Sequence, residues 1–170
     1  THPDTKELKS NVHRVLAENI ACGLDPDKAA LYCQSHVHET SELYLYLNML
    51  AYKGELEKTT TFKDKVRLHP QNVNAGLLTY PVLMATDILI HRASFVPVGK
   101  DQEQHLEMTR NFAQRFNHRY GDVFPEPVAF NFGESLLKVP SLDGTGKMSK
   151  SENQLATLYL ADDDDSIRNK

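Results

Sequence analysis

The sequence lacks any hydrophobic run that approaches the ~20 residues needed to span a bilayer, and it begins without the basic and apolar regions of a signal peptide. We therefore expect no membrane association and a cytoplasmic location. Cysteine is equally scarce, since Cys22 and Cys33 are the only two, and their spacing is typical of neither a metal site nor a disulfide framework. We expect both thiols to be reduced.

A strongly basic segment is also missing. The formal net charge is −4, and no stripe of lysine or arginine recurs along an expected helix, which argues against a free-standing nonspecific nucleic-acid binder. The eight histidines are scattered, without the spacing of metal ligands on helices. We interpret them as surface or packing residues and expect no metal ligands in the protein. What remains is a chain of 170 residues, 40% hydrophobic and 25% charged, long enough for one globular core.

Apolar residues at helical spacing predict four principal helices. They cover residues 4–22, 40–51, 74–91 and 101–120. Asp4 or Thr5 is suited to cap the first helix, and Gly23 and Gly121 are placed to end the first and the last. The third segment is almost wholly apolar, so we expect it to be buried.

Short apolar runs predict the strands of a parallel sheet. They are residues 30–33, 95–98 and 128–130. Helices that alternate with such strands predict an α/β fold with a Rossmann-like, doubly wound parallel sheet. The polar segment 54–74 resembles a connecting insertion, and the acidic residues 162–165 are suited to cap a final helix.

The segment Lys147-Met148-Ser149-Lys150-Ser151 follows Gly144-Thr145-Gly146. Two ammonium groups three residues apart, beside hydroxyls and after flexible glycines, suit a mobile loop that clamps a polyphosphate. Phosphoryl and nucleotidyl transfer require such positioned positive charge. An ordinary solvated loop is the alternative for a bare Lys-x-x-Lys pattern.

Asp87 is a carboxylate inside the apolar segment 83–90, where its burial is costly unless a donor reaches it. On a helix, Tyr80, Leu83 and Met84 share its face and would form an apolar wall around one acceptor. That arrangement suits a flat aromatic ligand with a single N–H or O–H. An internal partner, such as a lysine, an arginine or a backbone amide, is the alternative.

Gly99-Lys100-Asp101-Gln102 follows an expected strand, at the point where open α/β sheets bind ligands. Gly99 permits close backbone approach, the amides of residues 100 and 101 suit an anion or a ribose, and Gln102 offers both donors and acceptors. An ordinary turn capped by Asp101 explains the same residues equally well.

The lysine pentapeptide matches the signature of class I aminoacyl-tRNA synthetases letter for letter. Together with residues 79–89 and 96–102, in this order, it resembles the tryptophanyl-tRNA synthetase family. Residues 54–58 and 62–65 are similar to the connecting region of that family, so the resemblance extends over nearly the whole chain.

This resemblance implies tryptophan–tRNA ligase activity, with ATP and Mg²⁺, L-tryptophan and tRNA(Trp) as ligands. Asp87 would accept the indole N–H, and the tryptophan contacts would also include Tyr80, Met84, Val96, Val98 and Gln102. The ATP contacts would be Gly99, Lys100, Asp101, Val139, Lys147, Met148, Ser149, Lys150 and Ser151. Lys147 and Lys150 would be the catalytic residues, which bind the phosphates. Lys100 replaces the usual acidic residue of its motif, which puts a side-chain role at that position in doubt.

No His-x-Gly-His type motif of class I synthetases occurs in the sequence. We therefore expect residues 1–170 to be part of a catalytic domain, without the first strand that carries this motif and without the helical anticodon-binding domain. The piece alone should be inactive or nearly so. The resemblance further implies a homodimer that uses a helical connecting region at roughly residues 40–90.

Two other functions are compatible with parts of the sequence. A tyrosyl-tRNA synthetase shares the fold and the reaction, but it commonly varies the lysine loop and offers two partners to the phenolic hydroxyl, whereas Asp87 is one obvious acceptor here. A nucleotide-binding module that has lost catalysis is the second alternative, because the first motif is missing.

Overall fold

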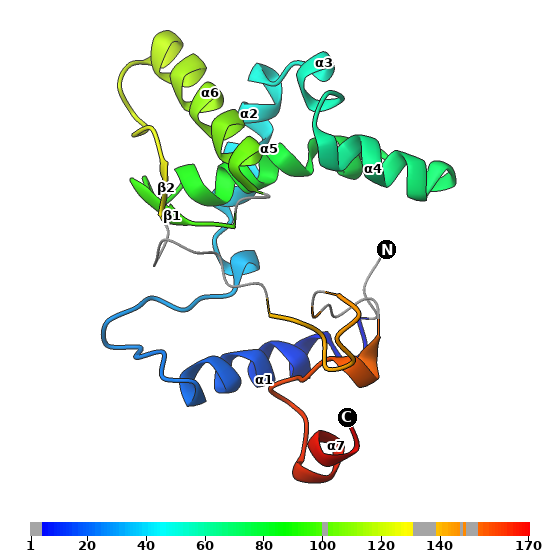
Figure 1. Cartoon of the computed structure of the whole chain (residues 1–170). Coiled ribbons are helices and arrows are strands. Elements are labelled where there is room, and N and C mark those ends of the chain that lie inside the picture. Colours follow the sequence, from blue (N-terminus) through cyan, green and yellow to red (C-terminus); the bar gives the residue numbers. More distant parts are fainter. Residues whose placement is uncertain (1–4, 100–101, 131–138, 147, 149–152) are drawn as a thin grey trace. The chain divides into compact units, whose positions relative to one another are not determined.

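The computed structural model describes residues 5–99, 102–130, 139–146, 148 and 153–170. The chain divides into two compact units, which Figure 1 shows in the colours of the sequence. The first unit consists of Thr1–Cys33 and Leu137–Lys170, and the second of Gln34–Leu136. Among the described helices, none combines the length and the apolar character that a membrane crossing requires.

Three of the expected helices form the centre of the second unit. They are α2 (Glu39–Leu50), α5 (Ala75–Leu89) and α6 (Glu103–Tyr120), and α5 packs against both of the others. Their shared core consists of buried apolar side chains, among them Leu47, Val82, Ala85, Leu89, Met108 and Phe112. These helices formed as predicted because each has an apolar face long enough to be buried against the next. The side chain of Asn74 caps α5 by accepting from the amide of Leu77 at 2.9 Å.

Strand β1 (Phe95–Pro97) and strand β2 (Val128–Phe130) pair in parallel, with Val96 opposite Ala129. Helix α6 connects them, so β1, α6 and β2 form the β–α–β arrangement expected for an α/β fold. In Figure 1 the two strands lie side by side at one end of the second unit. The strand, glycine and helix order around Gly99 is confirmed, although α6 begins at Glu103, two residues after the expected start.

The polar segment between α2 and α5 is more helical than its composition indicated. It contains α3 (Lys53–Leu56), α4 (Thr60–Leu68) and the 3-10 turn η2 (Pro70–Asn72). Arg115 on α6 holds α3 through an ion pair of 2.7 Å with Glu55, and it also donates to the carbonyl of Leu50, the last residue of α2, at 3.2 Å. The connecting segment is thereby fixed to the core.

The first unit contains α1 (Leu8–Ala21), the 3-10 turn η4 (Gln154–Ala156) and α7 (Asp164–Asn169). Helix α1 confirms the periodicity, but its N-cap residue is Glu7 rather than Asp4 or Thr5, without a side-chain cap. Gly23 lies just beyond its end with a φ of 101°, a conformation that favours glycine. Asp163 caps α7 as the acidic run predicted, since it accepts from the amide of Ser166 at 2.8 Å.

The prediction of a strand at residues 30–33 is wrong. These residues are irregular, and Tyr32 is 51% exposed. A short apolar run becomes a strand only where a neighbouring strand accepts its hydrogen bonds. In the described part of the chain, the sheet consists of β1 and β2 alone.

Candidate functional site

Helix α5 carries Tyr80, Met84 and Asp87, and all three are half-buried. The helical spacing had placed them on one face, and the structure confirms that they share this helix. Asp87 was expected to be buried, and it is half-buried, because Ile88 and Leu89 occupy the buried face of that turn. The carboxylate nevertheless receives a donor: Nε2 of Gln34 donates to Oδ1 of Asp87 at 2.7 Å. The partner is an uncharged amide rather than the cation that the alternative interpretation allowed.

Tyr80 faces α4 and the start of α6. Its hydroxyl lies 2.8 Å from Nε2 of His105, a residue that is only 2% exposed. Burial raises the pKa of Tyr80, and a hydrogen bond with Thr61 opposes that rise. The ammonium group of Lys65 lies 4.9 Å from the centre of the Tyr80 ring, within the range of a cation–π interaction. Tyr80 therefore joins the connecting segment to the site.

The remaining expected tryptophan contacts lie around the strand-to-helix turn. Val96 is half-buried in β1, and Val98 follows the strand. The carbonyl of Gly99 accepts a hydrogen bond from the amide of Gln102 at 2.9 Å, which closes the turn before α6. Because Tyr80 contacts His105 in the first turn of α6, the middle of α5 and this turn belong to one neighbourhood. Lys100 and Asp101 lie outside the described residues.

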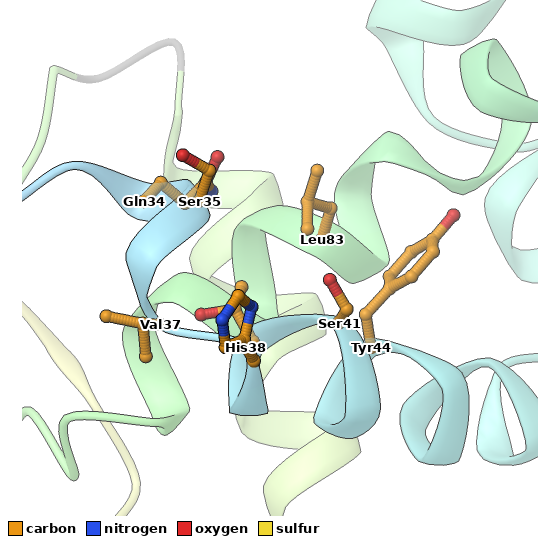
Figure 2. Close-up of a pocket in the computed structure, with 8 residues that line it drawn as sticks. Gln34, Ser35, Val37, His38, Ser41, Tyr44 and Leu83 are labelled. Carbon is orange, nitrogen blue, oxygen red and sulfur yellow. The ribbon is translucent and has the colours of Figure 1, made fainter.

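A hollow of about 360 Å³ lies beside the Gln34 and Asp87 pair. Figure 2 shows that Gln34 and Ser35 border it from the turn before α2, Ser41 and Tyr44 from α2, and Leu83 from α5. Its volume is within the range of small-molecule sites. None of the expected tryptophan contacts is among the residues that line it. Gln34 lines the hollow and also donates to Asp87, and Leu83 lies one helical turn before Asp87. The hollow therefore adjoins the acid.

The lysine loop lies largely outside the described residues, since only Met148 of its five residues is described. The expected ATP contacts Lys147, Ser149, Lys150 and Ser151 therefore have no described position. The base of the loop is ordered by backbone bonds: the amide of Met148 donates to the carbonyl of Val139 at 2.9 Å. Val139, one of the expected ATP contacts, is thus held beside the loop.

Asp143 organises the segment before the lysines. Its Oδ1 accepts from the Ser141 hydroxyl at 2.6 Å and from both the amide and the hydroxyl of Thr145, at 3.1 and 2.8 Å. Its Oδ2 accepts from Nδ2 of Asn153 at 3.3 Å, from the far side of the loop. These donors, of which the Ser141 hydroxyl has the largest effect, lower the pKa of Asp143 to about 2. One ionised carboxylate therefore ties together residues on both sides of the lysine loop.

Sequence reasoning did not identify Gln34 or His105. A polar amide directly after the apolar run 30–33 was the available signal for Gln34, because ligand-binding residues often follow such runs in α/β folds. His105 was interpreted only as a surface or packing residue. Its single weak signal was the helical spacing that buries it beside Leu106 and Thr109 on α6.

The whole chain, residues 1–170, matches the model of a family described as tRNA synthetases class I (W and Y). A tryptophan–tRNA ligase from Porphyromonas gingivalis is 62% identical over 171 residues, which cover all of this chain and 52% of that protein. The chain thus spans about half the length of this relative.

Solved structures show the same relationship. Tryptophanyl-tRNA synthetase from Campylobacter jejuni, complexed with ADP and tryptophan, has a TM-score of 0.79 and 41% identity over 88% of this chain and 46% of that one. The Mycoplasma pneumoniae tryptophanyl-tRNA synthetase has a TM-score of 0.83 and 37% identity over 98% and 50%, respectively. The α/β architecture with a parallel sheet therefore matches the Rossmann-like structures of these enzymes.

Proposed function

Because this chain belongs to the family of class I tRNA synthetases for tryptophan and tyrosine, we propose that its full-length protein is a tryptophan–tRNA ligase. The observation that carries the choice of amino acid is Asp87, the one charged residue of helix α5, whose carboxylate accepts from one amide donor. An acceptor of this kind suits the indole N–H, which can only donate. The 62% identity to a tryptophan–tRNA ligase supports the same substrate.

In the proposed reaction, the carboxylate of tryptophan attacks the α-phosphorus of ATP. A bond from the carboxylate oxygen to phosphorus forms, the bond from that phosphorus to the β-phosphate bridging oxygen breaks, and pyrophosphate leaves. A terminal ribose hydroxyl of tRNA(Trp) then attacks the tryptophanyl carbonyl and releases AMP. No protein nucleophile is needed, since positioned charge and orientation supply the catalysis.

The residues of this chain would bind and orient the substrates. Asp87 would hold the indole, with Tyr80, Met84, Val96 and Val98 around it, and Gln102 would bind the polar end of tryptophan. Gly99, Lys100, Asp101 and Val139 would bind ATP together with the lysine loop, in which Lys147 and Lys150 would neutralise the phosphates. Mg²⁺ would be held chiefly by those phosphates, as this cation commonly is.

We further propose that residues 1–170 are part of the catalytic domain and that roughly residues 40–90 form a connecting region with a dimer interface. Exposed apolar side chains on and just after α2 support a homodimer. They are Leu45, Tyr46, Met49 and Tyr52, with exposed fractions of 57, 57, 72 and 68%. The proposed location of the enzyme is the cytoplasm.

The proposal is tested by ATP–pyrophosphate exchange with the full-length protein. Tryptophan should stimulate the exchange and tyrosine should not, whereas the isolated chain of residues 1–170 should show little or none. Exchange driven by tyrosine alone would favour the sister enzyme. Full activity of the isolated chain would contradict its assignment as part of a catalytic domain.

A further inference from the structure

Gln34 and Asp87 are 53 residues apart in the sequence, yet their side chains form one of the short polar contacts of the second unit. Nε2 of Gln34 donates to Oδ1 of Asp87 at 2.7 Å, the distance expected where a carboxylate accepts from an N–H group. In the described part of the chain, no further hydrogen bond or ion pair to Asp87 is found. One carboxylate oxygen is therefore occupied, and the other is left as an acceptor.

The fold delivers Gln34 to this position. It opens the 3-10 turn η1 (Gln34–His36), whose bond from the amide of Val37 to the carbonyl of Gln34 measures 3.1 Å. Helix α2 begins directly after this turn and packs against α5, so the turn is carried to the flank of Asp87. The side chain of Gln34 then lines the 360 Å³ hollow next to Ser35, and Leu83 of α5 lines the same hollow (Figure 2).

This contact contributes little to folding. Gln34 is exposed and Asp87 is half-buried, and an exposed hydrogen bond adds little net stability because water replaces it when it is lost. Its effect on orientation is different in kind. A carboxylate at a helix surface can rotate among several side-chain conformations, and a fixed donor on one oxygen selects the direction in which the other oxygen points.

We propose that Gln34 is a positioning residue for the indole acceptor: it holds Asp87 so that the second carboxylate oxygen meets the N–H of the bound amino acid. This inference rests on the proposed function, because it requires Asp87 to bind tryptophan. It adds a specificity determinant from a different part of the chain, the turn before α2. The residue acts through Asp87 and need not touch the substrate.

The test compares Gln34→Met with Gln114→Met in the full-length protein. The substitution removes the amide and conserves side-chain length, and Gln114 is an exposed residue on α6 that serves as the matched control. Calorimetry measures the Kd for three ligands: tryptophan, ATP, and the analogue β-(3-benzothienyl)alanine, in which sulfur replaces the indole N–H. The analogue cannot donate to Asp87, so its affinity reports everything in the pocket except that hydrogen bond.

We expect Gln34→Met to weaken tryptophan binding roughly tenfold, the effect of losing one well-oriented bond to a charged group. Binding of the analogue and of ATP should stay unchanged, as should the Tm, so discrimination between the two amino acids falls by the same factor. Asp87→Ala should abolish that discrimination, and the double variant should lose no more than Asp87→Ala alone.

Three results would overturn the inference. If Gln34→Met binds tryptophan like the Gln114→Met control while Asp87→Ala loses it, Gln34 does not position the acid, and the proposed function is unaffected. If both Gln34→Met and Asp87→Ala bind tryptophan normally, the acid is not the indole acceptor, and the site assignment fails together with the inference. If Gln34→Met weakens tryptophan, analogue and ATP equally, its role is structural.

Discussion

The hydroxyl of Tyr80 on α5 lies 2.8 Å from Nε2 of His105, which is buried in the first turn of α6. This contact links the proposed tryptophan site on α5 to the start of α6. The two rings are 5.4 Å apart between centres and tilted by 35°. This pair connects the wall of the site to the core, and it makes Tyr80 a structural residue as well as a proposed ligand contact.

Tyr80→Phe should therefore destabilise the protein. The ring remains, but the nearly buried His105 loses its hydroxyl partner, which costs about 1–3 kcal/mol when a buried polar group is affected. Urea titration measures the free energy of unfolding. Tyr120→Phe at the end of α6, where Tyr120 is 60% exposed, is the control and should change it by less than about 0.5 kcal/mol. Equal stability of the two variants would show that the hydroxyl contact is unimportant.

Arg115→Met should release α3 from the core. The guanidinium makes an ion pair of 2.7 Å with Glu55, a hydrogen bond to Leu50 and a contact of 4.8 Å with the centre of the Tyr52 ring. Hydrogen exchange should therefore accelerate at residues 53–57. In contrast, Lys53→Met removes an exposed ion pair of 3.3 Å with Glu57 and should leave exchange nearly unchanged, because surface pairs contribute little. Unchanged exchange in Arg115→Met would contradict this account of the connecting segment.

Asp143→Asn should disorder the base of the lysine loop. The amide has one acceptor oxygen instead of two, so it cannot accept from all four groups that now donate to Asp143. ATP should bind more weakly while tryptophan binding is retained. Asp122→Asn, at an exposed position after α6, is the control. If ATP binds equally well to both variants, Asp143 is not needed for the nucleotide site.

The same carboxylate sets a pH dependence. Its pKa is lowered to about 2 from the ordinary value of 3.8, so the native state favours the ionised form. The stabilisation of the loop base is therefore complete above about pH 4 and is lost as the pH falls through the folded pKa near 2. An NMR titration of the Thr145 amide should show this low midpoint. A midpoint at the ordinary value of aspartate would mean that the four hydrogen bonds are not maintained.

Met49→Asp should convert the proposed homodimer into monomers. Met49 is 72% exposed on α2 among other exposed apolar side chains, and a charge in an apolar interface costs several kcal/mol unless it is paired. Sedimentation velocity of the full-length protein measures the change. Ser41→Asp, at an exposed polar position of the same helix, should leave the association state unaltered. A monomeric parent protein would refute the dimer itself.

Local patterns sufficed for the elements that bury their own apolar face. Helices α2, α5 and α6 formed as expected because their helical periodicity extends over 12, 15 and 18 residues. The strand expected at residues 30–33 failed, since four apolar residues do not specify a partner. The role of Gln34 could not be predicted for a related reason. Gln34 and Asp87 are 53 residues apart in the sequence, and a local pattern of apolar residues does not indicate such a distant contact.

The site was predictable to the extent that it resides in short motifs. Asp87 and Tyr80 stand out as polar groups in an apolar helix, and Gly99 and Gln102 as a turn after a strand. The environment of those groups was not predictable, because His105, Thr61 and Lys65 come from two other helices. Which side chains converge is decided by helix packing, and the residues concerned carry no motif of their own.

Calorimetry with tryptophan and with tyrosine, on the full-length protein and on its Asp87→Ala variant, tests the central claim most directly. The account predicts that the parent protein binds tryptophan and not tyrosine, and that Asp87→Ala loses most of the tryptophan affinity while its ATP affinity is preserved. Equal binding of both amino acids, or unchanged tryptophan affinity in Asp87→Ala, would contradict it.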